Sequence, residues 1–239
     1  MFDEIINSQK IYLIGELHPQ HQGELSVAKH MALNCKIHGF DCVKLQIYDA
    51  HTMPKGDLKQ YLEISSYWLD EFARYCEKIE IDFTFSIFDE KYFSLYDEYS
   101  VPFIKVASRS VSNKALINKI ISAGRPTLIS NGMFEIDELL KCEHIWGLQC
   151  VSKYPSFLGD FTWKPVNNKV VGYSCHHHGI EPMIYAAAHG ACVFEKHITP
   201  QKGFQCETEQ AHLGSLQISE LADLRSQLTI LRRMYAQNH

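Results

Sequence analysis

Two groups of histidines stand where they could bind a metal ion. His176, His177 and His178 follow an apolar run that predicts a β-strand, and a second apolar run ends in Glu195 and His197. Neighbouring residues of a strand point to opposite faces, so the three consecutive histidines can hardly share one ion. His176 and His197, on adjacent predicted strands, could both reach it, whereas His177 and His178 would line a neighbouring binding site or face solvent. Two imidazoles without a thiolate would suit Mn²⁺, Zn²⁺ or Fe²⁺.

Two lysines lie inside apolar segments, where a charge is costly to bury unless an anion pairs with it. Lys44 belongs to residues 42–48 and Lys105 to residues 103–108. Serines stand at the ends of neighbouring segments, and ammonium and hydroxyl groups together bind anions. The sequence therefore predicts a pocket for phosphate or carboxylate. Its serines would be Ser108, Ser130, Ser152 and Ser174.

Eight apolar segments alternate with stretches of helical periodicity. Strands buried on both faces read as continuous apolar runs, and eight of them with intervening helices in 239 residues is the count for a (β/α)8 TIM barrel. A doubly wound open sheet is the alternative. No repeat or linker divides the chain, so we expect one domain over residues 1–239. The expected strands occupy residues 10–17, 42–48, 83–88, 103–108, 126–132, 144–151, 169–176 and 192–199.

Helices are expected between most of these strands and after the last one. Glycine closes three of them, at Gly39, Gly124 and Gly190, where a left-handed cap is expected. The connection over residues 154–168 is too rich in Pro, Gly and Asn for a full helix, which predicts a loop or a short helix. The expected helices occupy residues 23–39, 65–79, 90–99, 113–124, 134–142, 179–191 and 219–235.

Side chains that could do chemistry gather at the carboxyl ends of most expected strands, which is the face that carries the active site of barrel enzymes. Glu16 ends the first strand and Tyr154 follows the sixth. A lone histidine or lysine is more often structural, so it is this convergence that favours a functional site. Residues two apart in a strand share a face. Three such pairs are Lys44 with Gln46, Ser174 with His176, and Glu195 with His197.

The composition excludes several classes of protein. A net charge of −5 and a pI near 6.2 leave no basic surplus for phosphates, which argues against a nucleic-acid partner. The N-terminus lacks the basic region of a secretory signal, and no apolar run approaches the roughly 18 residues of a membrane span. Eight cysteines are scattered singly, so we expect reduced thiols in a cytoplasmic protein. A small-molecule partner is expected.

The order and spacing of several short motifs are similar to those of one known family. The segments GELHPQHQG, VKLQ, FIKVAS, ISNGM, QCVSKYP, GYSCHH and FEKHIT occur in this order. Together they make the chain resemble the sialic acid synthase family from about Ile11 to about Leu224. Members of that family are barrel enzymes that condense phosphoenolpyruvate with an N-acetylated amino sugar, such as N-acetylmannosamine, to a nonulosonic acid and phosphate. The implied reaction is metal-assisted and cleaves a C–O bond.

The resemblance also implies roles for individual residues. His176 and His197 would be the metal ligands, with Mn²⁺ the usual ion and Mg²⁺ or another divalent cation a substitute. Glu16 matches the acidic residue beside the reacting centre, where it would assist proton transfer, and Glu195 matches a further glutamate. The phosphoenolpyruvate-binding residues would be Lys44, Lys105, Ser108, Ser130, Ser152 and Ser174. Gln46 and Tyr154 match positions that contact the sugar.

Several positions depart from the family pattern, mostly on the sugar side. Cys175 stands where the family has an aspartate before the first metal histidine. Arg109 and Ser110 replace a glycine and a glutamate, and Ile87 replaces a proline in the third strand. The phosphoenolpyruvate and metal positions are kept while acceptor positions vary. This pattern favours the same reaction on a different or modified acceptor.

The family normally carries a small C-terminal domain, similar to a type III antifreeze protein, whose arginine reaches the sugar site of the neighbouring subunit. The sequence ends at His239 without a counterpart of it. Glu207 or Glu209 would stand in for an aspartate of the family's last loop. A homodimer of barrels is one assembly that the resemblance allows. The other hypotheses are a barrel of the same descent acting on another acceptor, and a non-catalytic barrel that binds a sugar or a protein.

Overall fold

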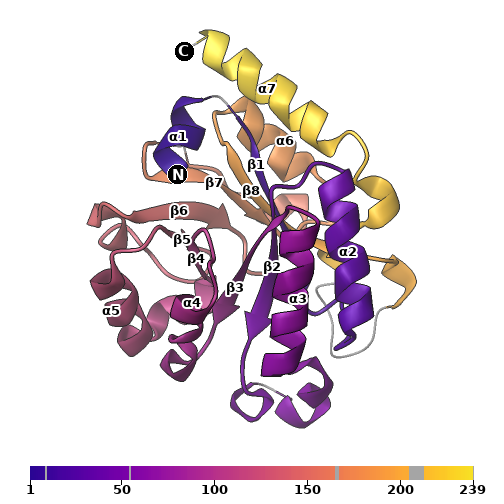
Figure 1. Ribbon diagram of the computed structural model, residues 1–239. Helices are drawn as coiled ribbons and strands as arrows, with labels where there is room; N and C mark the ends of the chain where they lie inside the picture. Colours follow the sequence, from indigo (N-terminus) through magenta and orange to yellow (C-terminus); the bar gives the residue numbers. More distant parts are fainter. Residues whose placement is uncertain (9, 54, 165–166, 205–212, 239) are drawn as a thin grey trace.

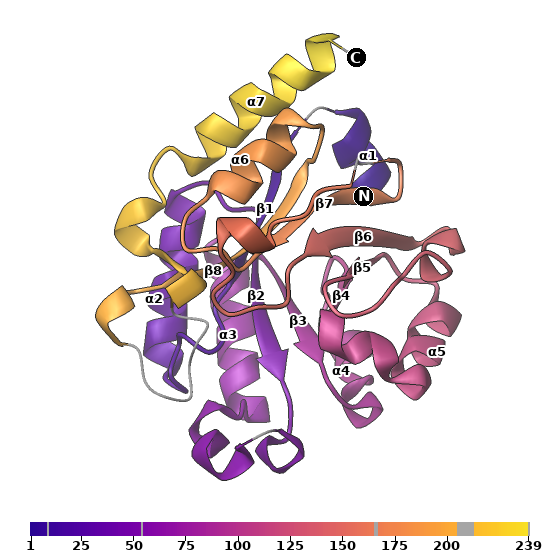
Figure 2. The ribbon, with the colours of Figure 1, turned by 180° about the vertical axis from the view of Figure 1, so that it is seen from behind.

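The computed structural model describes residues 1–8, 10–53, 55–164, 167–204 and 213–238. Eight parallel strands form a nearly closed barrel surrounded by helices (Figures 1 and 2). This confirms the predicted (β/α)8 fold and excludes the doubly wound sheet. A short ninth strand pairs with β8 beside the ring. The strands are β1 Tyr12–Glu16, β2 Cys42–Ile47, β3 Asp82–Ile87, β4 Ile104–Val106, β5 Thr127–Ser130, β6 Ile145–Cys150, β7 Val170–Cys175, β8 Val193–Thr199 and β9 Leu216–Gln217.

Backbone pairing joins the strands in the order β3-β2-β1-β8-β7-β6-β5-β4. β3 and β4 meet at the remaining seam, where the Thr84 hydroxyl donates a hydrogen bond of 2.7 Å to the carbonyl oxygen of Phe103. The parallel register sets Glu16 of β1 opposite both Lys44 of β2 and His197 of β8. The strand ends that carry the predicted site residues therefore lie on one rim.

The helical layer is uneven around the barrel. Figure 1 shows α2 and α3 side by side along β1 and β2, and α6 and α7 together over β7 and β8. Between β4 and β5 lies α5, whereas shorter helices lie between β3 and β4, between β5 and β6, and between β6 and β7. The helices are α1 Phe2–Asn7, α2 Leu25–Ile37, α3 Ser66–Lys78, α4 Leu95–Glu98, α5 Lys114–Ala123, α6 Glu181–Ala188 and α7 Leu224–Asn238.

Two predicted helices differ from the structure. Residues 134–142 contain only the 3₁₀ helix η6, Leu139–Lys141, and residues 90–99 form two short pieces. In the first segment a single turn buries Ile136 and Leu140, so no further helical turns are stabilised by packing. The loop predicted after β6 is confirmed, with the 3₁₀ helix η7, Leu158–Asp160, in its described part.

The predicted glycine caps are confirmed. Gly39, Gly124 and Gly190 have φ angles of 79°, 62° and 95°, in the left-handed region that glycine adopts without strain. Gly172 serves a different purpose in β7. A Cβ atom there would lie 1.7 Å from the carbonyl oxygen of Val193, so glycine allows β7 to approach β8.

An unpredicted helix, α1, closes the amino end of the barrel, opposite the strand arrowheads in Figure 1. Phe2 is fully buried, with its ring centroid 5.3 Å from that of Phe103 and 5.2 Å from that of Trp146. Tyr12 and Leu128 belong to the same apolar cluster inside the barrel. The carboxyl half of the interior is polar instead, so the apolar cluster lies beneath the polar pocket.

Seven of the eight cysteines lie in the described ranges, all as free thiols, and five of these are buried. Cys142 and Cys150 are partly exposed, and Cys206 lies outside the described residues. No helix in the described part of the chain is long and apolar enough to cross a membrane.

Candidate active site

A polar pocket opens at the carboxyl ends of the strands. It brings together all the predicted site residues except Ser152, whose Oγ lies 2.7 Å from the Oγ of Ser108 at the pocket wall. The lining also includes Ala107 and Cys150. The predicted residues that line it are Glu16, Lys44, Gln46, Lys105, Ser108, Ser130, Tyr154, Ser174, His176, Glu195 and His197.

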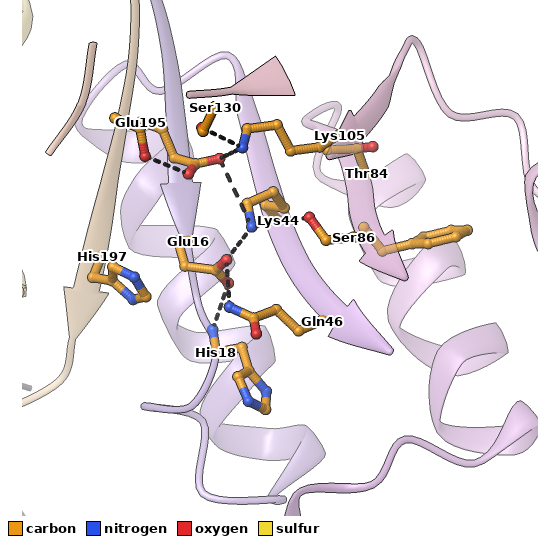
Figure 3. A network of polar contacts seen from close by, with 12 residues as sticks. Glu16, His18, Lys44, Gln46, Thr84, Ser86, Lys105, Ser130, Glu195 and His197 are labelled. Atoms are coloured by element: carbon orange, nitrogen blue, oxygen red, sulfur yellow. Dashed lines mark hydrogen bonds and ion pairs between the residues drawn. The ribbon is translucent and has the colours of Figure 1, made fainter. Parts of the chain in front are cut away.

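Two buried lysines and two buried carboxylates form the floor of the pocket (Figure 3). The Lys44 ammonium donates to Glu16 Oε2 and lies 3.7 Å from Glu195 Oε2. Lys105 Nζ lies 3.5 Å from the same oxygen of Glu195. Two positive and two negative charges alternate and balance, which is the pairing that buried charges need.

Hydroxyl and amide groups hold this network in place. Ser130 accepts a hydrogen bond of 2.9 Å from Lys105, and Ser174 donates one of 2.9 Å to Glu195 Oε1. The Gln46 amide donates to Glu16 Oε2 at 3.1 Å. Most polar atoms of the floor therefore have fixed partners before any ligand arrives.

The two carboxyl groups differ in their proton affinity. Burial raises the pKa of Glu16 above its usual range, against the opposing effect of Lys44. Burial also acts to raise the pKa of Glu195, but the ammonium groups of Lys105 and Lys44 outweigh it and hold that pKa at about 2. Environments that separate two carboxyl pKa values in this way assign a proton-transfer role to one and a fixed charge to the other. Of the two carboxyl groups, Glu16 is therefore the one that is more readily protonated.

His176 and His197 lie beside each other above this floor, with ring centroids 5.4 Å apart. His176 Nδ1 donates to the carbonyl oxygen of Val151 at 2.8 Å, which leaves Nε2 unprotonated. The side-chain amide of Gln20 packs against His197 Nδ1, with its nitrogen 3.3 Å and its oxygen 3.5 Å away. Burial lowers the pKa of both imidazoles, that of His176 to about 4. Both rings are therefore neutral, as a metal ligand must be.

These donors fit a metal ion only in part. In the ranges that the structure describes, no group of three or more His, Cys, Asp or Glu side chains could hold an ion. An ion at this place would have two imidazole ligands, with water or substrate oxygens supplying the others. The ring of Tyr154 lies 4.1 Å from that of His176 and 6.0 Å from that of His197, so an aromatic wall bounds the same space.

A chain of hydrogen bonds beside β1 fixes the position of Glu16. The backbone N–H of Gly23 donates to His21 Nδ1 at 3.0 Å, so His21 Nε2 carries the hydrogen and donates to His18 Nδ1 at 3.2 Å. His18 Nε2 then donates to the Tyr48 hydroxyl at 3.2 Å. The backbone N–H of His18 donates to Glu16 Oε1 at 2.9 Å. The tautomers of both rings are thereby set, and the carboxyl group is oriented.

Cys175 does not reach the pocket. It lies on the outer face of β7, where its Sγ is 3.5 Å from the Nζ of Lys196, a buried lysine on the outer face of β8. Lys196 also donates to the carbonyl oxygens of His177 and Gly179. Cys175 therefore contacts the lysine that holds the turn after β7, and it does not line the pocket.

The structure also shows the surroundings of other residues that the sequence analysis singled out. His177 is buried and donates from Nδ1 to the Ser156 carbonyl at 2.8 Å, so it neither lines the pocket nor faces solvent as expected. Ile87 packs in the outer apolar core. Glu207 and Glu209 lie outside the described residues.

Three contributors to the site were missed from the sequence. Ser86 accepts from Lys44 at 3.4 Å, Cys150 lines the pocket, and Gln20 contacts His197. Ser86 lies two positions after Thr84, whose side chain also faces inward, so the period of two could have found it. Gln20 lies in a loop without periodicity, and no local signal reveals its contact across the barrel.

Comparison with known proteins shows the family of the chain. The model of the NeuB family matches residues 31–239, which is most of the chain. The chain belongs to the NeuB family. The part matched includes every predicted site residue except Glu16.

Relatives with named activities extend over nearly the whole chain. The N-acetylneuraminate-9-phosphate synthase of Homo sapiens is 32% identical over 255 residues, which cover 93% of this chain and 70% of the relative. The N,N'-diacetyllegionaminic acid synthase of Campylobacter jejuni is 27% identical, covering 94% and 77%. A solved structure of N-acetylneuraminic acid synthetase from Leptospira borgpetersenii superimposes with a TM-score of 0.83 at 23% identity, covering 94% of this chain and 85% of the other. This last match shows a shared fold.

Proposed function

We propose that the chain is a nonulosonic acid synthase, which condenses phosphoenolpyruvate with an N-acetylated amino sugar and releases phosphate. The observation that carries the proposal is the buried network of Glu16, Lys44, Glu195 and Lys105 beneath two neutral histidines. The relatives named as synthases of neuraminic and legionaminic acids support this reaction type.

Phosphoenolpyruvate would bind on the floor of the pocket. Lys44 and Lys105 supply positive charge, and Ser108, Ser130 and Ser174 supply hydroxyl groups at its wall. An arriving anion competes with Glu16 for Lys44 and raises the pKa of that carboxyl further. Glu16 then takes up a proton, and the freed ammonium pairs with the ligand. Ser152 would act from behind Ser108, to which it is hydrogen-bonded.

The acceptor would bind above phosphoenolpyruvate, between Tyr154, Gln46 and the two histidines. A divalent cation such as Mn²⁺ or Mg²⁺, held by His176 and His197 with water, would supply positive charge that polarises the acceptor's aldehyde. The methylene carbon of phosphoenolpyruvate attacks the aldehyde carbon, and water adds to the resulting cationic C2. Collapse of that adduct cleaves the C–O bond and releases phosphate.

Glu16 and Glu195 would have different roles in the reaction. Glu16, with its raised pKa, is suited to exchange protons with the reacting oxygens or with the added water. Glu195 stays ionised because its pKa is about 2, and its negative charge stabilises the positive charge that develops at C2.

The proposal is tested by incubating the protein with phosphoenolpyruvate, Mn²⁺ and a panel of N-acetylated hexosamines. We expect at least one sugar to trigger release of phosphate and a nine-carbon 2-keto acid in the mass spectrum. Release in ¹⁸O-labelled water should place no label in the phosphate, because the C–O bond breaks. Label in the phosphate would contradict the cleavage step.

The free thiols support the further proposal of a reducing, cytoplasmic location. The homodimer stays a prediction.

A further inference from the structure

Arg109 occupies the rim directly after a pocket residue. It belongs to the 3₁₀ helix η5, Ser108–Ser112, which follows β4. Its neighbour Ser108 lines the pocket, while the Arg109 side chain is exposed. Partial burial lowers the pKa of its guanidinium, and the hydroxyl groups of Tyr154 and Tyr48 lie near enough to oppose that shift. The guanidinium stays charged at any physiological pH.

Two uncharged side chains hold this guanidinium in place. Its central carbon lies 4.5 Å from the centroid of the Phe88 ring, at the end of β3. Its Nη2 lies 3.1 Å from the sulfur of Met53, in the loop after β2. No ion pair joins Arg109 to a carboxylate within the ranges that the structure describes. An arginine has five N–H donors, so most of them remain available to a ligand.

Three lysines in the loops beyond the strand ends are paired, whereas Lys55 and Lys59 of the loop after β2 have no ion pair among the described residues. Lys91 pairs with Asp49 at 3.1 Å, Lys153 pairs with Asp160, and Lys202 pairs with Glu220 at 2.7 Å. The charges of the pocket floor also balance. Arg109 therefore adds a positive charge that its described neighbours leave without compensation, at the open side of the pocket.

We propose that Arg109 recognises an anionic group of the phosphate type on the end of the acceptor sugar remote from its reacting carbon. The inference rests on the proposed function, because that reaction fixes the acceptor's aldehyde near the two histidines and directs its other end toward the rim. A planar guanidinium held against a ring can offer two parallel N–H groups to a phosphate. The acceptor would then be a phosphorylated amino sugar.

Calorimetric titration tests this without requiring turnover. The protein is saturated with phosphoenolpyruvate in the absence of divalent cations, which keeps the second anion out of the lysine pocket. It is then titrated with N-acetylmannosamine, with its 6-phosphate, and with inorganic phosphate. We expect the 6-phosphate to bind about 10- to 100-fold more tightly than the neutral sugar, as charged hydrogen bonds typically allow.

Three variants test whether Arg109 causes the preference for the 6-phosphate. Arg109→Ala should remove the preference for the 6-phosphate, and Arg109→Lys should retain part of it. Lys91→Ala, which removes a neighbouring cation already paired with Asp49, should keep it in full. Equal affinity for both sugars, a failure of the 6-phosphate to bind, or a preference that survives in Arg109→Ala overturns the inference. Release of phosphate with any sugar is measured separately, so the synthase proposal can stand while the role of Arg109 falls.

Discussion

At the scale of single residues, Glu16 and Glu195 show how environment gives two identical side chains different properties. Both are buried, and both contact Lys44. Glu195 has a second ammonium, Lys105, and a hydroxyl donor, Ser174, whereas Glu16 has one ammonium and amide donors. The difference holds the pKa of Glu195 low and leaves that of Glu16 raised.

Glu16→Gln should lower turnover about 100-fold or more, the usual contribution of a proton-transfer group, because the amide cannot exchange the proton. Glutamine keeps the shape of the side chain, so calorimetry should still detect phosphoenolpyruvate binding. The exposed Glu181→Gln is the matched control and should keep normal turnover. Unchanged turnover in Glu16→Gln would remove Glu16 from the chemistry.

His176→Ala and His197→Ala should each abolish turnover that depends on Mn²⁺ while the far-ultraviolet circular dichroism stays that of the folded barrel. Each change removes one of the two imidazoles that the described residues bring to the pocket. His178→Ala, an exposed neighbour in the same histidine triplet, should retain metal-dependent turnover. Activity that persists in either first variant would show that the ligand assignment is wrong.

The sequence predicted which residues share the pocket better than it predicted their partners. The period of two placed Lys44 with Gln46 and Glu195 with His197, and the pocket contains all four. The pairing of Lys44 with Glu16 depends on the register between strands, which one chain segment does not encode. The outward direction of Cys175 follows from the same period, whereas its contact with Lys196 requires the fold.

At the scale of elements, α1 closes the amino end of the barrel. Its six residues carry one fully buried side chain, Phe2, so the segment has no helical periodicity that the sequence could reveal. The strands were predicted because they are buried on both faces and read as apolar runs. The helix expected over residues 134–142 failed because tertiary packing there needs only one turn.

Phe2→Ala should lower the free energy of unfolding by about 3–5 kcal/mol, the usual effect of removing a buried aromatic ring. The ring fills the space between Phe103, Trp146 and Tyr12, and no neighbour can easily replace it. Urea denaturation provides the measurement. Ile37→Ala, at a side chain that is 67% exposed, is the control and should change little. Equal effects of the two changes would show that α1 does not support the barrel.

At the scale of the whole molecule, the fold keeps several imidazoles neutral. Burial lowers the pKa of His21 to about 4 and also lowers that of His18. An unfolded histidine binds its proton near pH 6.5. Between pH 6.5 and about 4 the unfolded chain therefore binds more protons than the folded one, and stability must fall as the pH falls through this window.

The pH dependence of unfolding should reflect this. His21 contributes up to about 3 kcal/mol of stability that is present above pH 6.5 and lost progressively toward pH 4. His21→Gln removes this titration, so its free energy of unfolding should vary less steeply between pH 7 and pH 5 than that of the unaltered protein. The exposed His30→Gln should leave the slope unchanged. Parallel curves for His21→Gln and the unaltered protein would contradict the assignment.

The central claim is that the pocket at the strand ends condenses phosphoenolpyruvate with an amino sugar. The most direct measurement is phosphate release from phosphoenolpyruvate with Mn²⁺ and a panel of neutral and phosphorylated N-acetylhexosamines, with mass spectrometry of the products. The account predicts phosphate in equal amount to a new nine-carbon 2-keto acid, formed only when a sugar is present. Failure of every sugar to trigger phosphate release and product formation would contradict it.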